Sequence, residues 1–193
     1  MQVALITGGA GGIGRAITLR LARDGYAVAV VDRDRVLGAE TCALVEAAGV
    51  RAAFFEADVS SSAQVASFVK GAEEALGPIT AFVNNAGVEG AFAPIFDYPE
   101  EAFDQVFAVN AKGAFLCLKH VLARMRGHGA GAVVNLASTS SIRGRAGLAG
   151  YVASKHALLG LTRVAALDMA GTAIRVNAVL PGPVETQMIR EID

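Results

Sequence analysis

Tyr151 and Lys155, near the end of the chain, have side chains that could move a proton in a reaction. They are four positions apart in a segment with a helical pattern, so they lie on one helix face about one turn apart. A phenol beside a fixed positive charge ionises more easily, so its pKa falls from about 10 toward neutrality. The pair therefore predicts a tyrosine that exchanges a proton at physiological pH. Tyr151 could instead be a packed aromatic side chain with a satisfied hydroxyl group.

A glycine-rich segment, 7–14, follows the apolar run Val3–Ile6 and precedes the helical pattern Ile13–Asp24. A strand, a glycine turn and a helix in this order form the context of a dinucleotide-binding site. The turn lets the backbone approach a pyrophosphate, and the helix N-terminus offers unpaired N–H groups. A glycine-rich turn without a ligand is the alternative. Two registers fit: G-x-G-x-x-G through Gly9, Gly11 and Gly14, and T-G-x-x-x-G-x-G through Gly8, Gly12 and Gly14.

An acidic residue, Asp32, ends the apolar run Ala27–Val31, 20 positions after Gly12. A carboxylate there can accept hydrogen bonds from the ribose hydroxyls of NAD and would repel the extra phosphate of NADP. The nearby Arg33 and Arg35 could accommodate that phosphate, and Asp32 could also be a helix cap or a solvated charge. Because the carboxylate stands at the strand tip, we expect NAD, with NADP as the less favoured cofactor.

Length and composition restrict the classes of protein to which the chain can belong. It has 193 residues, enough for one α/β domain over 1–193. The net charge is −1 and the pI about 6.3, so nothing indicates a nucleic-acid partner. No apolar run reaches the roughly 18 residues of a membrane span, and Met1 leads into a strand without a charged leader. We therefore expect a cytoplasmic protein without a membrane partner.

The cysteines and histidines give no sign of a disulfide or a metal site. Cys42 and Cys117 fall in helical patterns, which indicates buried thiols in a reducing compartment. His120, His128 and His156 have no metal-binding spacing, so we expect no metal.

Strand and helix patterns alternate along the whole chain. The strand patterns are Val3–Ile6, Ala27–Val31, Ala52–Glu56, Ala81–Val83, Ala132–Leu136 and Arg175–Val179. The helical patterns are Ile13–Asp24, Arg35–Ala48, Ser62–Leu76, Pro99–Val109, Lys112–Arg126 and Gly150–Ala170. This alternation predicts an α/β protein with a Rossmann-type, doubly wound parallel sheet in three layers. Such sheets bind ligands at the carboxyl ends of their strands, where this chain places Asp32, Asp58, Asn84, Asn85 and Ser138.

With these motifs in order, the chain resembles the short-chain dehydrogenase/reductase family from Val3 to Thr186. Ser138 lies 13 positions before Tyr151, as in the family pattern. The resemblance implies an NAD(P)-dependent oxidoreductase that acts on CH–OH groups. The matching segments are Thr7-Gly8-x-x-x-Gly12-Ile13-Gly14, Asp58-Val59, Asn84-Asn85-Ala86-Gly87, Asn110, Ser138, Tyr151-x-x-x-Lys155, and Pro181-Gly182 with Thr186.

The resemblance also assigns roles to four residues as a catalytic tetrad. Tyr151 would be the general acid or base, and Lys155 would hold the nicotinamide ribose and lower the Tyr151 pKa. Ser138 would hydrogen-bond the substrate oxygen, and Asn110 would position a water that links Lys155 to solvent. Ser138 could otherwise belong to an ordinary loop, and Asn110 could cap a helix.

The cofactor contacts follow from the same resemblance and from Asp32. Asp58 and Val59 would contact the adenine, and Pro181, Gly182 and Thr186 would pack on the nicotinamide. The full expected set is Gly8, Gly12, Ile13, Gly14, Asp32, Asp58, Val59, Asn84, Ala86, Gly87, Tyr151, Lys155, Pro181, Gly182 and Thr186.

Several charged residues border the expected substrate position. Arg143 and Arg145 could bind an anionic group, or could form salt bridges within the loop. Glu89, after the Asn-Asn-Ala-Gly motif, could also face the pocket. The segments Val88-Glu89-Gly90 and Ile142-Arg143-Gly144 resemble those of family members that act on cyclic secondary alcohols and ketones.

Two further features concern assembly and chain length. The patterns 151–170 and 115–125 are apolar beyond one face, which indicates a subunit interface in a homodimer or homotetramer, or a deeply buried helix in a monomer. Family members continue for several dozen residues past the position of Thr186, with a substrate lid and a last edge strand. We therefore expect an incomplete chain whose sixth strand forms the sheet edge.

Three functions remain possible on these residues. The first is hydride transfer between NAD(H) and a small secondary alcohol or ketone. The second is an NADP-dependent 3-oxoacyl-thioester reductase, which Asp32 disfavours. The third is a non-catalytic dinucleotide-binding regulator, which the complete tetrad disfavours.

Overall fold

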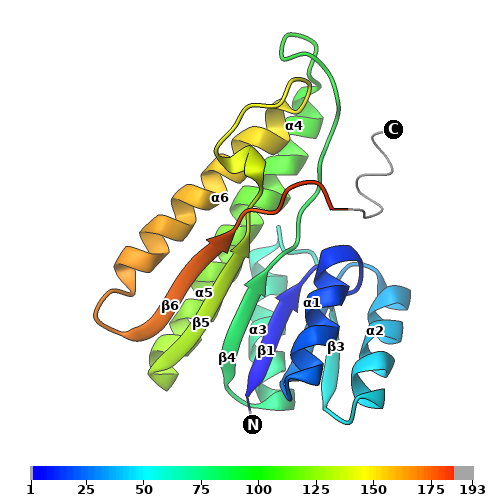
Figure 1. Ribbon diagram of the computed structural model, residues 1–193, viewed down its shortest axis with the longest axis vertical. Coiled ribbons are helices and arrows are strands. Elements are labelled where there is room, and N and C mark those ends of the chain that lie inside the picture. Colours follow the sequence, from blue (N-terminus) through cyan, green and yellow to red (C-terminus); the bar gives the residue numbers. More distant parts are fainter. Residues whose placement is uncertain (1, 185–193) are drawn as a thin grey trace.

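A computed structural model describes residues 2–184 and shows a parallel six-stranded sheet with helices on both faces (Figure 1). The strand order is β3-β2-β1-β4-β5-β6, with the change of direction between β1 and β4. All strand pairs are parallel, and Thr7 at the end of β1 pairs with Asn84 at the end of β4. The doubly wound sheet predicted from the sequence is confirmed.

The strands are β1 (Val3–Thr7), β2 (Ala27–Asp32), β3 (Ala52–Glu56), β4 (Ile79–Asn84), β5 (Ala130–Leu136) and β6 (Ala173–Val179). The helices are α1 (Gly12–Arg23), α2 (Arg35–Ala47), α3 (Ser62–Leu76), α4 (Glu100–Phe107), α5 (Ala114–His128) and α6 (Ala149–Asp168). A π-helical turn, η1 (Ala108–Gly113), joins α4 to α5, and a 3₁₀ turn, η2 (Thr139–Ser141), follows β5.

Alternation along the strands divides the core into two layers. Leu5 and Ala29 face α3 and α5, whereas Ile6 and Val30 face α1 and α2. Strands that are buried on both faces need apolar residues at every position, which explains the unbroken apolar runs of β1 and β2.

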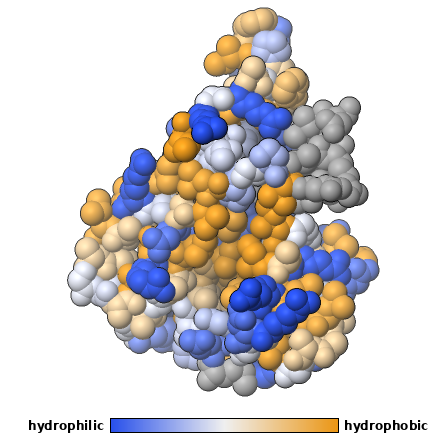
Figure 2. Space-filling model, in the orientation of Figure 1, coloured by the Kyte–Doolittle hydropathy of each residue, from blue (hydrophilic) through white to orange (hydrophobic). Residues whose placement is uncertain are grey.

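The two faces of the sheet are covered unequally. Helices α3, α5 and α6 pack on one face, and α1 and α2 pack on the other beside β1–β3. In the part of the chain that the structure describes, no helix covers β5 and β6 on the second face, and Val179 is exposed there. Figure 2 shows apolar surface gathered over this part of the sheet. Within residues 2–184, β6 is the edge strand, as expected.

Local signals set where several helices begin and end. The Asp34 side chain caps α2 by accepting a hydrogen bond from the Leu37 amide at 2.9 Å. Gly77 and Gly129 end α3 and α5 with positive φ angles, a conformation that glycine adopts without steric cost.

The continuous helical stretch Glu100–His128 is long and apolar enough to cross a membrane by length and composition. It is the one such stretch within residues 2–184. Half of its most apolar window is buried inside the protein, where α5 packs against α3 and β4. The apolar residues of α5 thus form part of the core.

Candidate active site

A cavity of about 740 Å³ opens at the carboxyl ends of the strands, where the chain reverses its direction of winding. It runs from the glycine turn after β1 to the first turns of α6. Most of the predicted site residues line it: Gly8, Gly12, Ile13, Gly14, Asp32, Asp58, Val59, Ala86, Gly87, Ser138, Tyr151, Lys155, Pro181 and Gly182. Thr186 lies outside the described residues.

The glycine turn shows which of the two registers the backbone needs. Gly8 and Gly12 have φ angles of +62° and +50°, where a side chain would be strained. A Cβ at Gly14 would lie 1.9 Å from the Gly8 carbonyl oxygen, so α1 can approach β1 only with glycine there. The geometry fits the T-G-x-x-x-G-x-G register and leaves the turn open to a bound phosphate.

Asp32 is fixed at the end of β2 by backbone amides. Its Oδ2 accepts a hydrogen bond from the Ala10 amide at 3.0 Å. Its Oδ1 accepts from the amides of Arg33 at 2.8 Å and Asp34 at 3.2 Å. The carboxylate thus joins the glycine turn to the end of β2. It also lines the cavity, where it can accept hydrogen bonds from ribose hydroxyls.

The far end of the cavity combines apolar walls with a second carboxylate. Val31, Ala57 and Val59 line this end, a lining that suits a flat aromatic base. Asp58 Oδ1 accepts a hydrogen bond from the Ser60 amide at 2.9 Å, and this bond is the main cause that lowers the pKa of Asp58. The carboxylate therefore remains ionised beside the apolar walls.

Lys155 is a buried cation with a single hydrogen bond to the described part of the chain. Its side chain is on α6, and the residue is only 5% exposed. Nζ donates a hydrogen bond to the Leu136 carbonyl oxygen at 2.8 Å and lies 5.7 Å from the centroid of the Tyr151 ring. Burial lowers the pKa of Lys155 to about 8 because desolvation disfavours the charged form.

The pKa of Tyr151 corrects one expectation. The sequence predicted a lowered value because of Lys155, whereas the structure has the Tyr151 pKa raised, chiefly by burial of the phenol. A side-chain hydrogen bond with Ser138 and the positive charge of Arg145 lower it, and the negative charge of Glu89 raises it. Desolvation of the phenol thus outweighs the hydrogen bond and the neighbouring charges.

Ser138 is held in place by the turn that it begins. Its Oγ accepts a hydrogen bond from the Ser140 amide at 3.1 Å, and its own amide donates to Ser141 Oγ at 3.1 Å. This reciprocal cap fixes the Ser138 side chain next to the Tyr151 hydroxyl. The serine hydroxyl therefore points its proton toward the phenol oxygen, at the place where a substrate oxygen would bind.

Asn110 connects three segments instead of lining the cavity. Its Oδ1 accepts from the Val88 amide and its Nδ2 donates to the Val88 carbonyl, both at 2.8 Å. Nδ2 also donates to Ser154 Oγ on α6 at 3.0 Å. The π turn directs Asn110 toward both partners, a use of π turns that is frequent at functional sites.

Asn84 also lies behind the cavity, with partners that no sequence motif indicated. Its Nδ2 donates to the Ala114 carbonyl at 3.1 Å and to Asn135 Oδ1 at 3.0 Å. Asn135 Nδ2 then donates to Thr162 Oγ1 at 2.9 Å. This buried polar chain joins β4, β5 and α6 and thereby fixes the helix that carries Tyr151. Asn135 and Thr162 could have been suspected only as polar residues in apolar runs.

The next residue, Asn85, does line the cavity, although it was not among the expected contacts. Its Nδ2 donates to the carbonyl oxygens of Thr7 and Gly8, both at 3.0 Å. It thus ties the end of β4 to the glycine turn. Its place in the Asn-Asn-Ala-Gly motif was the available signal.

The substrate end of the cavity has charged walls. Val88 and Glu89 come from the segment after β4, and Arg143 and Arg145 come from the segment before α6. Both segments border Tyr151, so any molecule at the phenol also meets these charges.

The residues present fit a dinucleotide with a nicotinamide end. The glycine turn suits the pyrophosphate, and Asp32 suits the adenine-side ribose. Pro181 and Gly182 line the cavity near Tyr151 and Lys155, where the nicotinamide riboside would lie.

Comparisons with known proteins agree with this geometry. A sequence model of the family described as short chain dehydrogenase matches residues 2–193. The levodione reductase of Leifsonia aquatica is 42% identical over 190 residues, which is 97% of this chain and 71% of that protein. This chain thus spans about seven tenths of that relative's length.

Solved structures give the same result. A crystal structure of levodione reductase superposes with a TM-score of 0.96 at 40% identity and covers 99% of this chain and 75% of that one. The NAD⁺-bound xylitol dehydrogenase has a TM-score of 0.92 at 42% identity (94% and 70%). The 3-ketoacyl-(acyl-carrier-protein) reductase of Brucella melitensis with NADH has a TM-score of 0.93 at 31% identity (98% and 78%). The chain therefore belongs to the short-chain dehydrogenase family and is an oxidoreductase that acts on CH–OH groups.

Proposed function

We propose that this enzyme transfers a hydride between NAD(H) and a small secondary alcohol or ketone, with Tyr151 as the general acid or base. The observation that carries the proposal is the convergence of Tyr151, Lys155 and Ser138 in one cavity with the glycine turn and Asp32. A binding protein without activity would not need a hydroxyl proton donor beside a phenol and a buried ammonium group.

The nicotinamide cofactor, when bound, supplies or accepts the hydride. Tyr151 gives its hydroxyl proton to the carbonyl oxygen during reduction and takes a proton from the alcohol during oxidation. Ser138 donates a hydrogen bond to the same substrate oxygen and supports its developing negative charge. Lys155 holds the ribose hydroxyls of the cofactor, and its charge favours the tyrosinate form.

Lys155 also provides the next position for the proton. Its pKa of about 8 lets the amine hold or release a proton near physiological pH. Asn110, through Val88 and Ser154, orders the backbone beside Lys155. We assign Asn110 to the route by which a water links this amine to solvent.

NAD is the proposed cofactor because of Asp32, whose fixed carboxylate would repel a 2′-phosphate. The related xylitol dehydrogenase and Brucella melitensis reductase were crystallised with NAD⁺ and NADH. The Asp32→Asn variant tests this assignment, since it keeps a hydrogen-bonding group and removes the charge. We expect the ratio of kcat/KM for NADP to that for NAD to rise about tenfold, or about 1.4 kcal/mol. An unchanged ratio would assign cofactor choice to other residues.

Cyclic secondary alcohols and ketones are the proposed substrates. The alternatives are a 3-oxoacyl thioester, as the name of the Brucella protein suggests, and regulation without catalysis. We further propose a cytoplasmic homodimer or homotetramer in which α5 and α6 meet across subunits. Phe115 on α5 and Val164 and Leu167 on α6 support this assembly, because these apolar side chains are exposed.

The experiment is a spectrophotometric assay of nicotinamide reduction with NAD and NADP in parallel. The panel contains matched cyclic and acyclic secondary alcohols and a 3-hydroxyacyl thioester. We expect turnover of cyclic alcohols with NAD. Turnover of the thioester with NADP alone would favour the reductase, and NADH binding without turnover of any substrate would favour the regulator.

A further inference from the structure

A tyrosine outside the expected tetrad, Tyr98, reaches the neighbourhood of Tyr151 from the segment between β4 and α4. Its hydroxyl oxygen is buried and has no hydrogen-bond partner within the described chain. An unpaired buried hydroxyl destabilises a protein, and phenylalanine would fill nearly the same space without this loss. The presence of the oxygen atom therefore calls for an explanation.

Two glycines surround that oxygen. A Cβ at Gly90 would lie 2.9 Å from Tyr98 Oη, and a Cβ at Gly150 would also lie 2.9 Å from it. Gly90 directly follows Glu89, and Gly150 directly precedes Tyr151. The hydroxyl oxygen thus lies between Gly90 and Gly150, the neighbours in sequence of Glu89 and Tyr151, whose side chains line the cavity.

Other contacts join the same two segments. The Ala93 amide donates a hydrogen bond to the Gly147 carbonyl at 3.0 Å, and Ala93 forms an isolated parallel bridge with Leu148. The Phe92 ring lies over Gly147, where a Cβ would be 2.6 Å from the ring. We call this junction of residues 90–98 with residues 147–150 the seam. Glu89 and Arg145 line the cavity and are close in sequence to the two segments of the seam, so the seam borders the substrate end.

We propose that Tyr98 is a positioning residue of the active site: its hydroxyl oxygen, seated between Gly90 and Gly150, sets the separation of Glu89 from Tyr151. The inference rests on the acid–base role proposed for Tyr151. Tyr98 acts through the width of the cavity and touches neither substrate nor cofactor in this account.

The test introduces a methyl group at Gly150 and then removes the oxygen atom that it would meet. Gly150→Ala forces Tyr98, and with it Glu89, away from Tyr151. In the double variant Tyr98→Phe with Gly150→Ala, the nearest ring carbons would lie 3.4 Å from the new Cβ, which is tolerable. Gly127→Ala is the matched control, because Gly127 is also in a helix, α5, and a Cβ there meets nothing within 4 Å.

We expect Gly150→Ala to lower kcat/KM at least tenfold and the double variant to recover most of the loss. Gly127→Ala should keep the wild-type rate, and Tyr98→Phe should keep or raise Tm because an unpaired hydroxyl is removed. A Gly150→Ala variant with wild-type kcat/KM would overturn the proposal. So would a double variant that folds, by circular dichroism, and is as slow as the single one.

The pH profile separates positioning from general loosening. Tyr151 is surrounded by Glu89, by Arg145, by the Ser138 hydroxyl and by Lys155 on its own helix. The charge of Glu89 raises the Tyr151 pKa, so moving Glu89 away should lower that pKa. The acid limb of the pH profile for alcohol oxidation should therefore shift to lower pH in Gly150→Ala. The shift should vanish when Glu89→Gln is also present. A shift that persists with Glu89→Gln would contradict the role of the separation.

Tyr151→Phe, assayed in parallel, distinguishes the two proposals. If it keeps full turnover, the proposed function fails, whatever the seam variants show. If it loses turnover and the rescue is absent, only the role of Tyr98 fails.

Discussion

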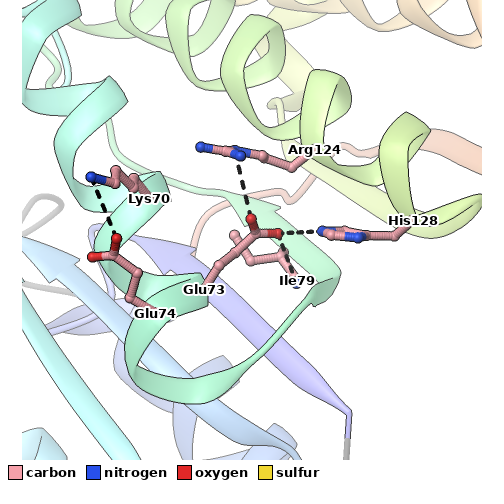
Figure 3. A network of polar contacts seen from close by, with 6 residues as sticks. All are labelled: Lys70, Glu73, Glu74, Ile79, Arg124 and His128. Carbon is pink, nitrogen blue, oxygen red and sulfur yellow. Dashed lines mark hydrogen bonds and ion pairs between the residues drawn. The ribbon is translucent and has the colours of Figure 1, made fainter.

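The two ends of the sheet each hold a charged side chain that is largely removed from water, but they compensate it differently. At the amino end, Glu73 is 14% exposed and accepts a hydrogen bond from the Ile79 amide at 3.3 Å. His128 lies 2.7 Å and Arg124 3.6 Å from its carboxylate, so α3, α5 and the start of β4 meet there (Figure 3). At the carboxyl end, Lys155 is more deeply buried and, among the described residues, donates a hydrogen bond to one backbone carbonyl.

This difference indicates that Glu73 serves the stability of the fold, whereas Lys155 serves the activity of the enzyme. An amide and two basic side chains compensate the Glu73 carboxylate for much of the hydration that it loses on partial burial. Glu73 can therefore stabilise the contact between α3 and α5. A buried ammonium group with one neutral partner destabilises the free protein, and such costs are typical of functional sites. The account therefore predicts that mutations at the two ends have opposite effects.

The largest expected effect follows from Lys155→Met, which removes the charge and keeps most of the side-chain volume. We expect kcat to fall at least a hundredfold, within the range of general acid–base contributions. We expect the free energy of unfolding at pH 7 to rise by about 2 kcal/mol, since relief of a charge cost of about 3 kcal/mol exceeds the loss of one hydrogen bond. Turnover assays and urea unfolding measure the two quantities. A slow but destabilised variant would refute the comparison.

The pH dependence of that stability difference sharpens the comparison. The folded-state pKa of Lys155 is about 8, below its ordinary value of 10.5, so the unfolded chain binds more protons between these values. The cost of burying the charge is complete below pH 8 and is relieved as pH rises toward 10.5. The stability advantage of Lys155→Met should therefore shrink by about 3 kcal/mol over this range.

The two cysteine thiols should cancel in that difference. Burial raises the pKa of Cys42 to about 11 and of Cys117 to about 12, so the folded state becomes less stable as these thiols ionise in the unfolded chain above pH 9. Both proteins contain them, so unfolding of the two proteins must be compared at each pH. A constant difference from pH 7 to 10 would show that Lys155 is not the titrating group.

The smallest expected effect comes from the amino end. Glu73→Ala should lower the free energy of unfolding by about 1–2 kcal/mol. It leaves the Ile79 amide without its acceptor and removes the carboxylate that pairs with Arg124 and His128. It should leave kcat/KM unchanged, since Glu73 is remote from the cavity. Glu73→Gln is the matched control, which keeps an acceptor for Ile79 and should lose less. A reduced kcat/KM in Glu73→Ala would mean that the two ends are coupled.

The periodicity of the sequence was enough to predict the strands and the helix faces, because buried parallel strands need continuous apolar runs. The boundaries were less accurate: β4 spans Ile79–Asn84, although the pattern indicated only 81–83. The helical patterns that end at Val109 and begin at Lys112 are one continuous helical stretch with a π turn. That turn coincides with the hydrogen bonds of Asn110 to Val88 and Ser154, which no local pattern contains.

For the site, the sequence predicted which residues meet but not their electrostatic balance. Tyr151 and Lys155 do lie together, yet burial raises the pKa of the tyrosine and lowers that of the lysine. Burial depends on the packing of β5, η2 and α6, so spacing alone cannot reveal it. Likewise, the role inferred for Tyr98 depends on contacts with two glycines that are distant in the sequence.

The most direct measurement is the turnover of Tyr151→Phe with NAD and a secondary alcohol that the wild-type enzyme oxidises, together with its NADH affinity by fluorescence titration. The account predicts a loss of kcat of at least a hundredfold with the NADH Kd unchanged within about threefold. A variant that keeps the wild-type kcat would contradict the assignment of proton transfer to the carboxyl end of the sheet.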